Sequence, residues 1–218
     1  MSHDDIVRRL ERCGAVPILR MREAGPGIDV CRALVAGGID VFEVTMGTPN
    51  ALDVIRDVRA AFGDAVAVGA GTVLDPETAR LAVSAGAQFV VAPNLNPELI
   101  RFCRRYSVPV LPGAFTPTEI VAAWEAGADL VKVFPVRAVG PSYLRDVLAP
   151  LPQIRLVAVG GVTLENAGDF IRAGATAVGI GGELLSPELI RAGRFTELEA
   201  RARALAEAIA AARTQATA

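Results

Sequence analysis

Short, continuous apolar segments recur along the 218 residues at nearly regular intervals. Continuous rather than alternating apolar character is typical of parallel strands that are covered on both faces. The stretches between them are amphipathic, and an Ala-Gly or Phe-Gly pair marks the expected end of a helix in several of them. The pattern predicts a strand and helix unit repeated eight times, with strands at residues 15–19, 41–46, 65–68, 89–92, 108–111, 130–134, 156–159 and 177–180.

Eight consecutive units of this kind can close into a (β/α)8 barrel. A doubly wound open sheet would usually have a glycine-rich turn after its first strand, but Arg20-Met21-Arg22-Glu23 follows that strand here. We therefore expect a single-domain α/β barrel that spans residues 1–218. An additional N-terminal helix is expected within residues 1–14, a last helix over residues 195–213, and a frayed tail over residues 214–218.

Charge and cysteine content exclude several classes of function. The net charge is -2 with interspersed charges, which gives neither a basic stripe for nucleic acid nor a polybasic membrane patch. No apolar run is long enough to suggest a membrane span. Cys13, Cys31 and Cys103 show no disulfide or zinc-binding spacing, so a reducing cytoplasm is expected. The only histidine, His3, leaves no histidine cluster for a catalytic metal, and the chemistry is expected to need neither metal nor cofactor.

Lys132 is the only lysine in the chain, although Lys and Arg together number 22. It lies within the apolar segment 130–134, where side-chain alternation puts it on the same face as Leu130 and Phe134. Val131 and Val133 suit packing against helices, so Lys132 is expected to point into the barrel. The same parity in the segment 41–46 points Glu43 inward.

An inward amine and an inward carboxylate could be only a buried ion pair. Schiff-base catalysis, which needs a neutral amine and a group that moves protons, explains more of the surroundings. Desolvation would lower the pKa of the amine and raise that of the carboxyl, whereas their mutual attraction has the opposite effect. The sequence leaves open which effect is larger.

Other unusual residues fall where strands are expected to end, which is the end of such barrels that carries the chemistry. They include Arg20, Thr72 and Pro93. The glycine pairs 160–161 and 181–182 end the last two strands, where bare backbone N–H groups can approach a phosphate. A tight turn is the alternative for either pair alone.

Several of these motifs together resemble the 2-keto-3-deoxy-6-phosphogluconate aldolase family. The resemblance rests on Glu43-Val44-Thr45, Gly69-Ala70-Gly71-Thr72, Val91-Ala92-Pro93-Asn94, Lys132-Val133-Phe134-Pro135 and Val159-Gly160-Gly161-Val162. It implies a metal-free class I aldolase, usually a homotrimer, that splits a 2-keto-3-deoxy-6-phospho sugar acid into pyruvate and glyceraldehyde 3-phosphate. By this resemblance Lys132 is the Schiff-base lysine, Glu43 is the acid and base, Thr72, Pro93 and Phe134 line the pyruvyl pocket, and Gly160, Gly161, Gly181 and Gly182 hold the phosphate.

The chain departs from the gluconate-type pattern in three ways that concern the substrate. Val159 stands before the first glycine pair, where gluconate-type members have a threonine. No arginine follows Glu43 closely, so Arg20 is expected to anchor the carboxylate instead. Glu183 follows the second glycine pair, where it would repel a phosphate unless it points away. The galactonate-type branch looks closer in several places, including Arg20 and Val159. Cleavage of 4-hydroxy-2-oxoglutarate, a sugar-phosphate isomerase or epimerase without a covalent lysine, and a binding barrel without catalysis stay open as alternatives.

Overall fold

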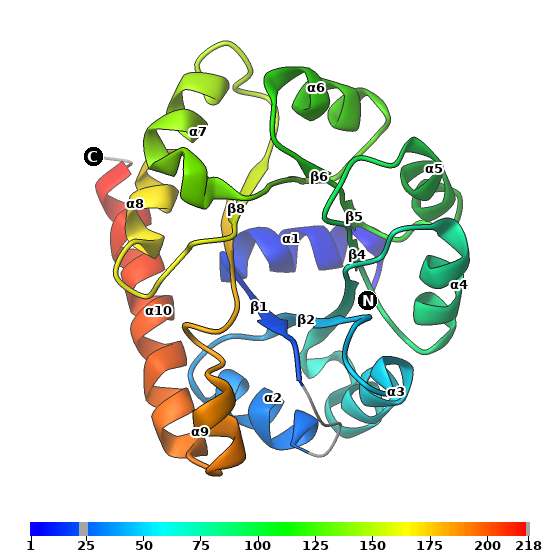
Figure 1. Cartoon of the computed structure of the whole chain (residues 1–218), viewed down its shortest axis with the longest axis vertical. Coiled ribbons are helices and arrows are strands. Elements are labelled where there is room, and N and C mark those ends of the chain that lie inside the picture. The colour runs from blue at the N-terminus through cyan, green and yellow to red at the C-terminus, as the bar shows by residue number, and fades with distance from the viewer. Residues whose placement is uncertain (22–25, 217–218) are drawn as a thin grey trace.

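The computed structural model describes residues 1–21 and 26–216 of the chain. Parallel strands form a closed barrel, and helices surround it (Figure 1). The expected barrel, with a helix before its first strand, is confirmed. The strands are β1 (Ala15–Leu19), β2 (Val41–Thr45), β3 (Ala67–Gly71), β4 (Val90–Val91), β5 (Val110–Leu111), β6 (Gly113–Ala114), β7 (Val131–Val133), β8 (Leu156–Val159) and β9 (Ala177–Ile180).

The described residues form nine strand segments because the fifth strand of the barrel is interrupted at Pro112. The segment before it, β5, pairs with β4, and the segment after it, β6, pairs with β7. Proline has no N–H for a ladder, but the carbonyl of Pro112 still accepts a hydrogen bond from the Lys132 amide at 2.9 Å. The two segments thus close the barrel as one bent strand, in agreement with the eight units expected from the sequence.

The third strand differs from the sequence expectation at both ends. Ala65 belongs to a short 3-10 turn, η1 (Gly63–Ala65), and β3 continues to Gly71. Glycine is uncommon inside strands, which explains why the pattern of apolar residues ended the predicted strand too early. The extension matters for the site because it carries Gly71 to the level of β2, where Thr45 pairs with Gly71.

Helix starts follow from local capping chemistry. Asp75, Asn96 and Thr116 each accept hydrogen bonds from the first backbone N–H groups of the helix that follows, and a proline comes next in all three. The longer helices are α1 (His3–Cys13), α2 (Gly27–Ala36), α3 (Ala51–Phe62), α4 (Pro76–Ser84), α5 (Pro97–Arg105), α6 (Pro117–Glu125), α7 (Gly140–Leu148) and α10 (Phe195–Ala216). Shorter ones are η2 (Val136–Ala138), α8 (Ala167–Arg172) and α9 (Pro187–Arg191).

The last helix is longer than expected. It continues through residue 216 rather than ending at Arg213, so the residues 214–216 that were expected to fray are helical. Arg213 donates hydrogen bonds to the carbonyls of Glu11 and Arg12, which ties this end of α10 to α1. Residues 217–218 lie outside the described part of the chain.

Two buried layers fix the inside and the outside of the barrel. Phe42, Val44, Val131 and Val133 pack in the layer between strands and helices, as the alternation in the sequence predicts. The inner layer combines strand residues with Ile6, Val7 and Leu10 of α1, which is amphipathic and lies across the barrel in Figure 1. Helix α1 therefore closes the end of the barrel at which the strands begin. Within residues 1–21 and 26–216, no helix is both long and apolar enough to cross a membrane.

Candidate active site

A pocket of about 680 Å³ opens at the end of the barrel at which the strands finish. Its walls come from the ends of strands and from the turns that follow them. Every residue singled out from the sequence lines this one pocket, namely Arg20, Glu43, Thr72, Pro93, Lys132, Phe134, Gly160, Gly161, Gly181 and Gly182. The fold thus brings together groups that are spread over most of the chain.

Lys132 lies in the middle of β7, opposite Gly113 of β6 and Val157 of β8. Its side chain is only 6 % exposed, and its Nζ lies 5.1 Å from the centre of the Phe134 ring. Burial lowers the pKa of the amine below its usual value; the charge of Glu43 opposes this shift, and that of Arg20 adds to it. The environment therefore favours a neutral, nucleophilic amine.

Glu43 lies on β2, between Ile18 of β1 and Gly69 of β3, and is 2 % exposed. Burial raises the pKa of its carboxyl, and this effect exceeds the opposing effect of the positive charges of Lys132 and Arg20. No direct ion pair joins Glu43 to Lys132 in the part of the chain that the structure describes. Desolvation is thus the larger effect on both groups, which resolves the balance that the sequence left open.

Beneath the pocket, a small cavity explains this desolvation. Glu43 and Lys132 line it together with apolar strand residues of the inner layer. It holds too little space for more than a water molecule. The two ionisable groups therefore lie at the boundary between an apolar barrel interior and an open pocket. The other residues that line the small cavity are Val16, Ile18, Val91, Leu111, Val157, Val159 and Gly179.

Gly71 gives the Glu43 carboxyl the room that it occupies. A Cβ atom at position 71 would overlap with the Glu43 carboxylate and lie 3.2 Å from its Cγ. The glycine at the end of β3 is thus a packing requirement of the neighbouring carboxylate.

Replacing Gly71 with alanine is therefore expected to displace the Glu43 carboxylate. With Glu43 as the acid and base that the sequence predicts, kcat is expected to fall by about 100-fold, since a misplacement of about 1 Å costs a catalytic group this much. Gly47→Ala is the matched control, because a Cβ there has no neighbour within 4 Å. Steady-state kinetics and thermal unfolding of both variants check the prediction. Equal kcat values for the two variants would contradict it.

The turn after β8 presents its backbone to the pocket. Gly160 and Gly161 have positive φ values of 86° and 101°, which favour glycine. Asn166 holds this turn, because its side chain donates to the Gly161 carbonyl at 3.1 Å and accepts from the Thr163 amide at 2.8 Å. Across the pocket, Thr72 also has a left-handed φ of 57°, a conformation that costs a β-branched residue about 1–2 kcal/mol.

The second glycine pair has a different reason to lack side chains. Cβ atoms at Gly181 and Gly182 would meet no atom within 4 Å, so packing does not require glycine there. Gly181 and Gly182 leave open space at the mouth of the pocket. Glu183 lines the same part of the pocket and is exposed.

Sequence reasoning missed two polar residues of the pocket, Arg137 and Thr163. Arg137 lies in η2, and Thr163 lies in the turn after Gly161. Neither belongs to a strand, so the alternation of side chains that identified Lys132 as inward-facing does not apply to them. Their nearness in sequence to the ends of β7 and β8 was the available signal.

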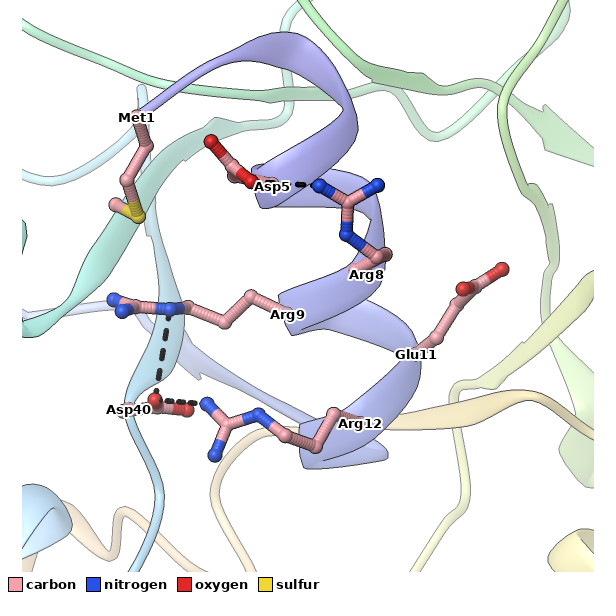
Figure 2. A pocket seen from close by; sticks show the side chains of 7 residues that line it. All are labelled: Met1, Asp5, Arg8, Arg9, Glu11, Arg12 and Asp40. Carbon is pink, nitrogen blue, oxygen red and sulfur yellow. Dashed lines mark hydrogen bonds and ion pairs between the residues drawn. The ribbon is translucent and has the colours of Figure 1, made fainter.

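A larger hollow of about 950 Å³ lies elsewhere, along α1 (Figure 2). Its charged side chains are paired: Arg8 binds Asp5, both Arg9 and Arg12 bind Asp40, and Glu11 binds Arg155, which lies outside the hollow. Arg9 Nη1 is buried without a hydrogen-bond partner among the described residues. None of the residues that line this hollow also lines the pocket with Lys132. In residues 1–21 and 26–216, no three His, Cys, Asp or Glu side chains are grouped to hold a metal ion.

Comparison with known proteins gives a consistent result over most of the chain. Residues 6–201 match the family described as KDPG and KHG aldolase. The 2-dehydro-3-deoxy-phosphogluconate aldolase of Treponema pallidum is 37% identical over 89% of this chain and 93% of its own length. The 2-dehydro-3-deoxy-6-phosphogalactonate aldolase of Escherichia coli is 40% identical over 76% of this chain and 78% of its own length.

Solved structures agree. The KDPG aldolase of Legionella pneumophila, captured with pyruvate as a covalent carbinolamine intermediate, superposes with a TM-score of 0.86 at 26% identity, over 91% of this chain and 97% of its own. The fold, the pocket at the carboxyl ends of the strands and the match over residues 6–201 point the same way. The chain belongs to the KDPG and KHG aldolase family.

Proposed function

We propose that this protein is a class I aldolase that cleaves a 2-keto-3-deoxy-6-phospho sugar acid into pyruvate and glyceraldehyde 3-phosphate. The observation that carries the proposal is a desolvated amine and a desolvated carboxyl in one pocket, with a direct ion pair absent from the described part of the chain. The names of the relatives and the carbinolamine in the Legionella pneumophila structure support it.

In this mechanism the neutral amine of Lys132 attacks the C2 carbonyl of the substrate. Loss of water from the carbinolamine gives an iminium ion, which can accept the electrons of the breaking bond. Glu43 as carboxylate takes the proton of the C4 hydroxyl, the bond between C3 and C4 breaks, and the aldehyde leaves. Glu43 then returns a proton to C3 of the enamine, and hydrolysis releases pyruvate and the free amine.

Arg20 is proposed to bind the carboxylate next to the reacting carbonyl. It lines the pocket and is close enough to affect the pKa values of both Lys132 and Glu43. A guanidinium binds a carboxylate through two parallel hydrogen bonds, which would orient C2 toward the amine. Thr72, Pro93 and Phe134 are proposed to enclose the pyruvyl group.

A second candidate substrate is 4-hydroxy-2-oxoglutarate, which yields pyruvate and glyoxylate. Two features support this substrate. The family description includes KHG aldolase. Glu183 lines the part of the pocket where a phosphate is expected, and its negative charge disfavours a phosphate there. The same amine and carboxyl would cleave either substrate, because the bond that breaks is the same. Measured kcat/KM values for the gluconate-type, galactonate-type and unphosphorylated substrates decide among them.

Reductive trapping with pyruvate tests the covalent step directly. With a single lysine in the chain, the Met1 amine is the only competing site. Cyanoborohydride is expected to fix one pyruvyl group on Lys132, identified by intact mass and peptide mapping. Because the pKa of Lys132 is lowered, the trapping rate is expected to rise with pH and reach its half-maximum below pH 10.5.

An adduct confined to Met1, or none, would refute the covalent mechanism. Activity that requires an added divalent metal would then favour an isomerase or epimerase, and stoichiometric binding without turnover would favour a binding barrel. Either result would leave Lys132 as an electrostatic group.

The proposed assembly is a homotrimer, by similarity to the family. Size-exclusion chromatography with light scattering checks this, and a monomeric mass would refute it. Cys13, Cys31 and Cys103 are free, which supports a reducing location such as the cytoplasm.

A further inference from the structure

Two guanidinium groups line the pocket, those of Arg20 and Arg137. Arg20 affects the pKa values of Lys132 and Glu43, whereas Arg137 contributes to neither. Of the two arginines, Arg20 is therefore the one whose charge acts on the two ionisable groups. Both arginines are exposed, and no carboxylate pairs with either of them in the described ranges 1–21 and 26–216.

The backbone fixes Arg137 beside the glycine turn. The Arg137 amide donates to the Gly160 carbonyl at 2.7 Å. A Cβ atom at Gly161 would lie 2.6 Å from the Cβ of Arg137, so the arginine packs directly on the bare backbone of that glycine. Any side chain at position 161 would push Arg137 away. The start of the Arg137 side chain is therefore held against the Gly160–Gly161 turn.

The negative charge of Glu183 indicates why an anion bound in this pocket needs a cation such as Arg137 beside it. Glu183 lines the same pocket, and its side chain has no cationic partner among the residues that the structure describes. Its backbone carbonyl accepts a hydrogen bond from Arg201 at 3.2 Å. An anion bound between the two glycine pairs would meet this carboxylate unless a nearby cation offset it. Arg137 is the pocket-lining cation on the glycine side.

We propose that Arg137 is a specificity-determining residue, which binds the terminal phosphate of the substrate and so selects phosphorylated over unphosphorylated substrates. This inference rests on the proposed function and names the group that recognises the far end of its substrate. A guanidinium matches a phosphate through paired, charge-assisted hydrogen bonds. The second carboxylate of 4-hydroxy-2-oxoglutarate is attached to the carbon that becomes the aldehyde, so it stays near Lys132 and away from Arg137.

The test compares Arg137→Gln with Arg137→Lys and with Arg101→Gln. Arg101 is an exposed arginine of α5 outside the pocket, so its replacement makes the same change in net charge. Arg137→Gln is expected to raise KM for the phosphorylated substrate by about 10- to 100-fold, the effect of losing a hydrogen bond to a charged group. The value of kcat and the KM for 4-hydroxy-2-oxoglutarate are expected to change by less than about threefold. Arg137→Lys restores part of the loss, and Arg101→Gln shows none.

Binding of glycerol 3-phosphate separates this inference from the proposed function, because it requires no turnover. The wild-type protein is expected to bind this probe, Arg137→Gln to bind it about 10-fold more weakly or worse, and Glu183→Gln to bind it more tightly. Trapping of pyruvate on wild-type Lys132 reports the proposed function alone. The role of Arg137 is overturned if Arg137→Gln binds glycerol 3-phosphate as tightly as the wild type, if Arg101→Gln weakens binding equally, or if both substrates lose the same factor.

Discussion

Lys132→Arg is expected to lower kcat by at least about 10⁴-fold, whichever substrate is cleaved, because removal of a covalent nucleophile removes the whole reaction path. The guanidinium keeps the positive charge but does not lose its proton, so it cannot attack a carbonyl. The measurement is single-turnover cleavage with coupled detection of pyruvate. Full activity in this variant would refute the Schiff-base mechanism.

Lys132→Met shows whether loss of activity comes from loss of the fold. The pKa of Lys132 is lowered in the folded protein, so the fold is destabilised at pH values below the folded pKa and recovers as the pH rises toward 10.5. Removing the amine removes that cost at neutral pH. Lys132→Met is therefore expected to unfold at a temperature no lower than the wild type while it is inactive. A clear fall in Tm would instead make the lysine a structural residue.

Glu43→Gln is expected to lower kcat by about 10²- to 10⁴-fold, the usual contribution of a positioned acid and base. Glutamine has nearly the same shape and resembles the protonated carboxyl, which burial already favours by raising the pKa of Glu43. The substitution should therefore preserve the packing against Gly71 and remove only proton transfer.

Pyruvate distinguishes the role of Glu43 from that of Lys132. In Glu43→Gln, reductive trapping on Lys132 is expected to continue at a reduced rate, while exchange of the C3 protons of pyruvate with deuterated water falls by the same factor as kcat. NMR follows the exchange. Wild-type exchange in Glu43→Gln would show that another group moves the protons.

The proposed reacting pair could be located from the sequence because side chains alternate along a strand with a period of two. Lys132 and Glu43 each interrupt a continuous apolar segment, and alternation puts both on the inner face, where the structure has them. The barrel itself followed from counting such segments. Both inferences use regular elements, whose side-chain directions depend only on residue spacing.

Features outside regular elements could not be predicted in this way. Arg137 lies in a 3-10 turn, and its position depends on how η2 packs against the Gly160–Gly161 turn. The break at Pro112 and the contact of Gly71 with Glu43 depend on register between strands, which one sequence does not state. The balance between desolvation and attraction at Lys132 likewise required knowledge of the space around it.

Helix α1 closes one end of the barrel, and this bears on the order of events in the proposed mechanism. Ile6, Val7 and Leu10 of α1 close the barrel at one end. Substrate, water and both products must therefore enter and leave through the pocket at the other end. In the proposed mechanism, the aldehyde fragment forms on the side of that opening, and the pyruvyl group stays attached to Lys132 until the imine is hydrolysed. Water can reach the imine by the route that the aldehyde has vacated. With a single opening, this mechanism predicts that the aldehyde, which forms first, also leaves first, and that its departure permits the release of pyruvate.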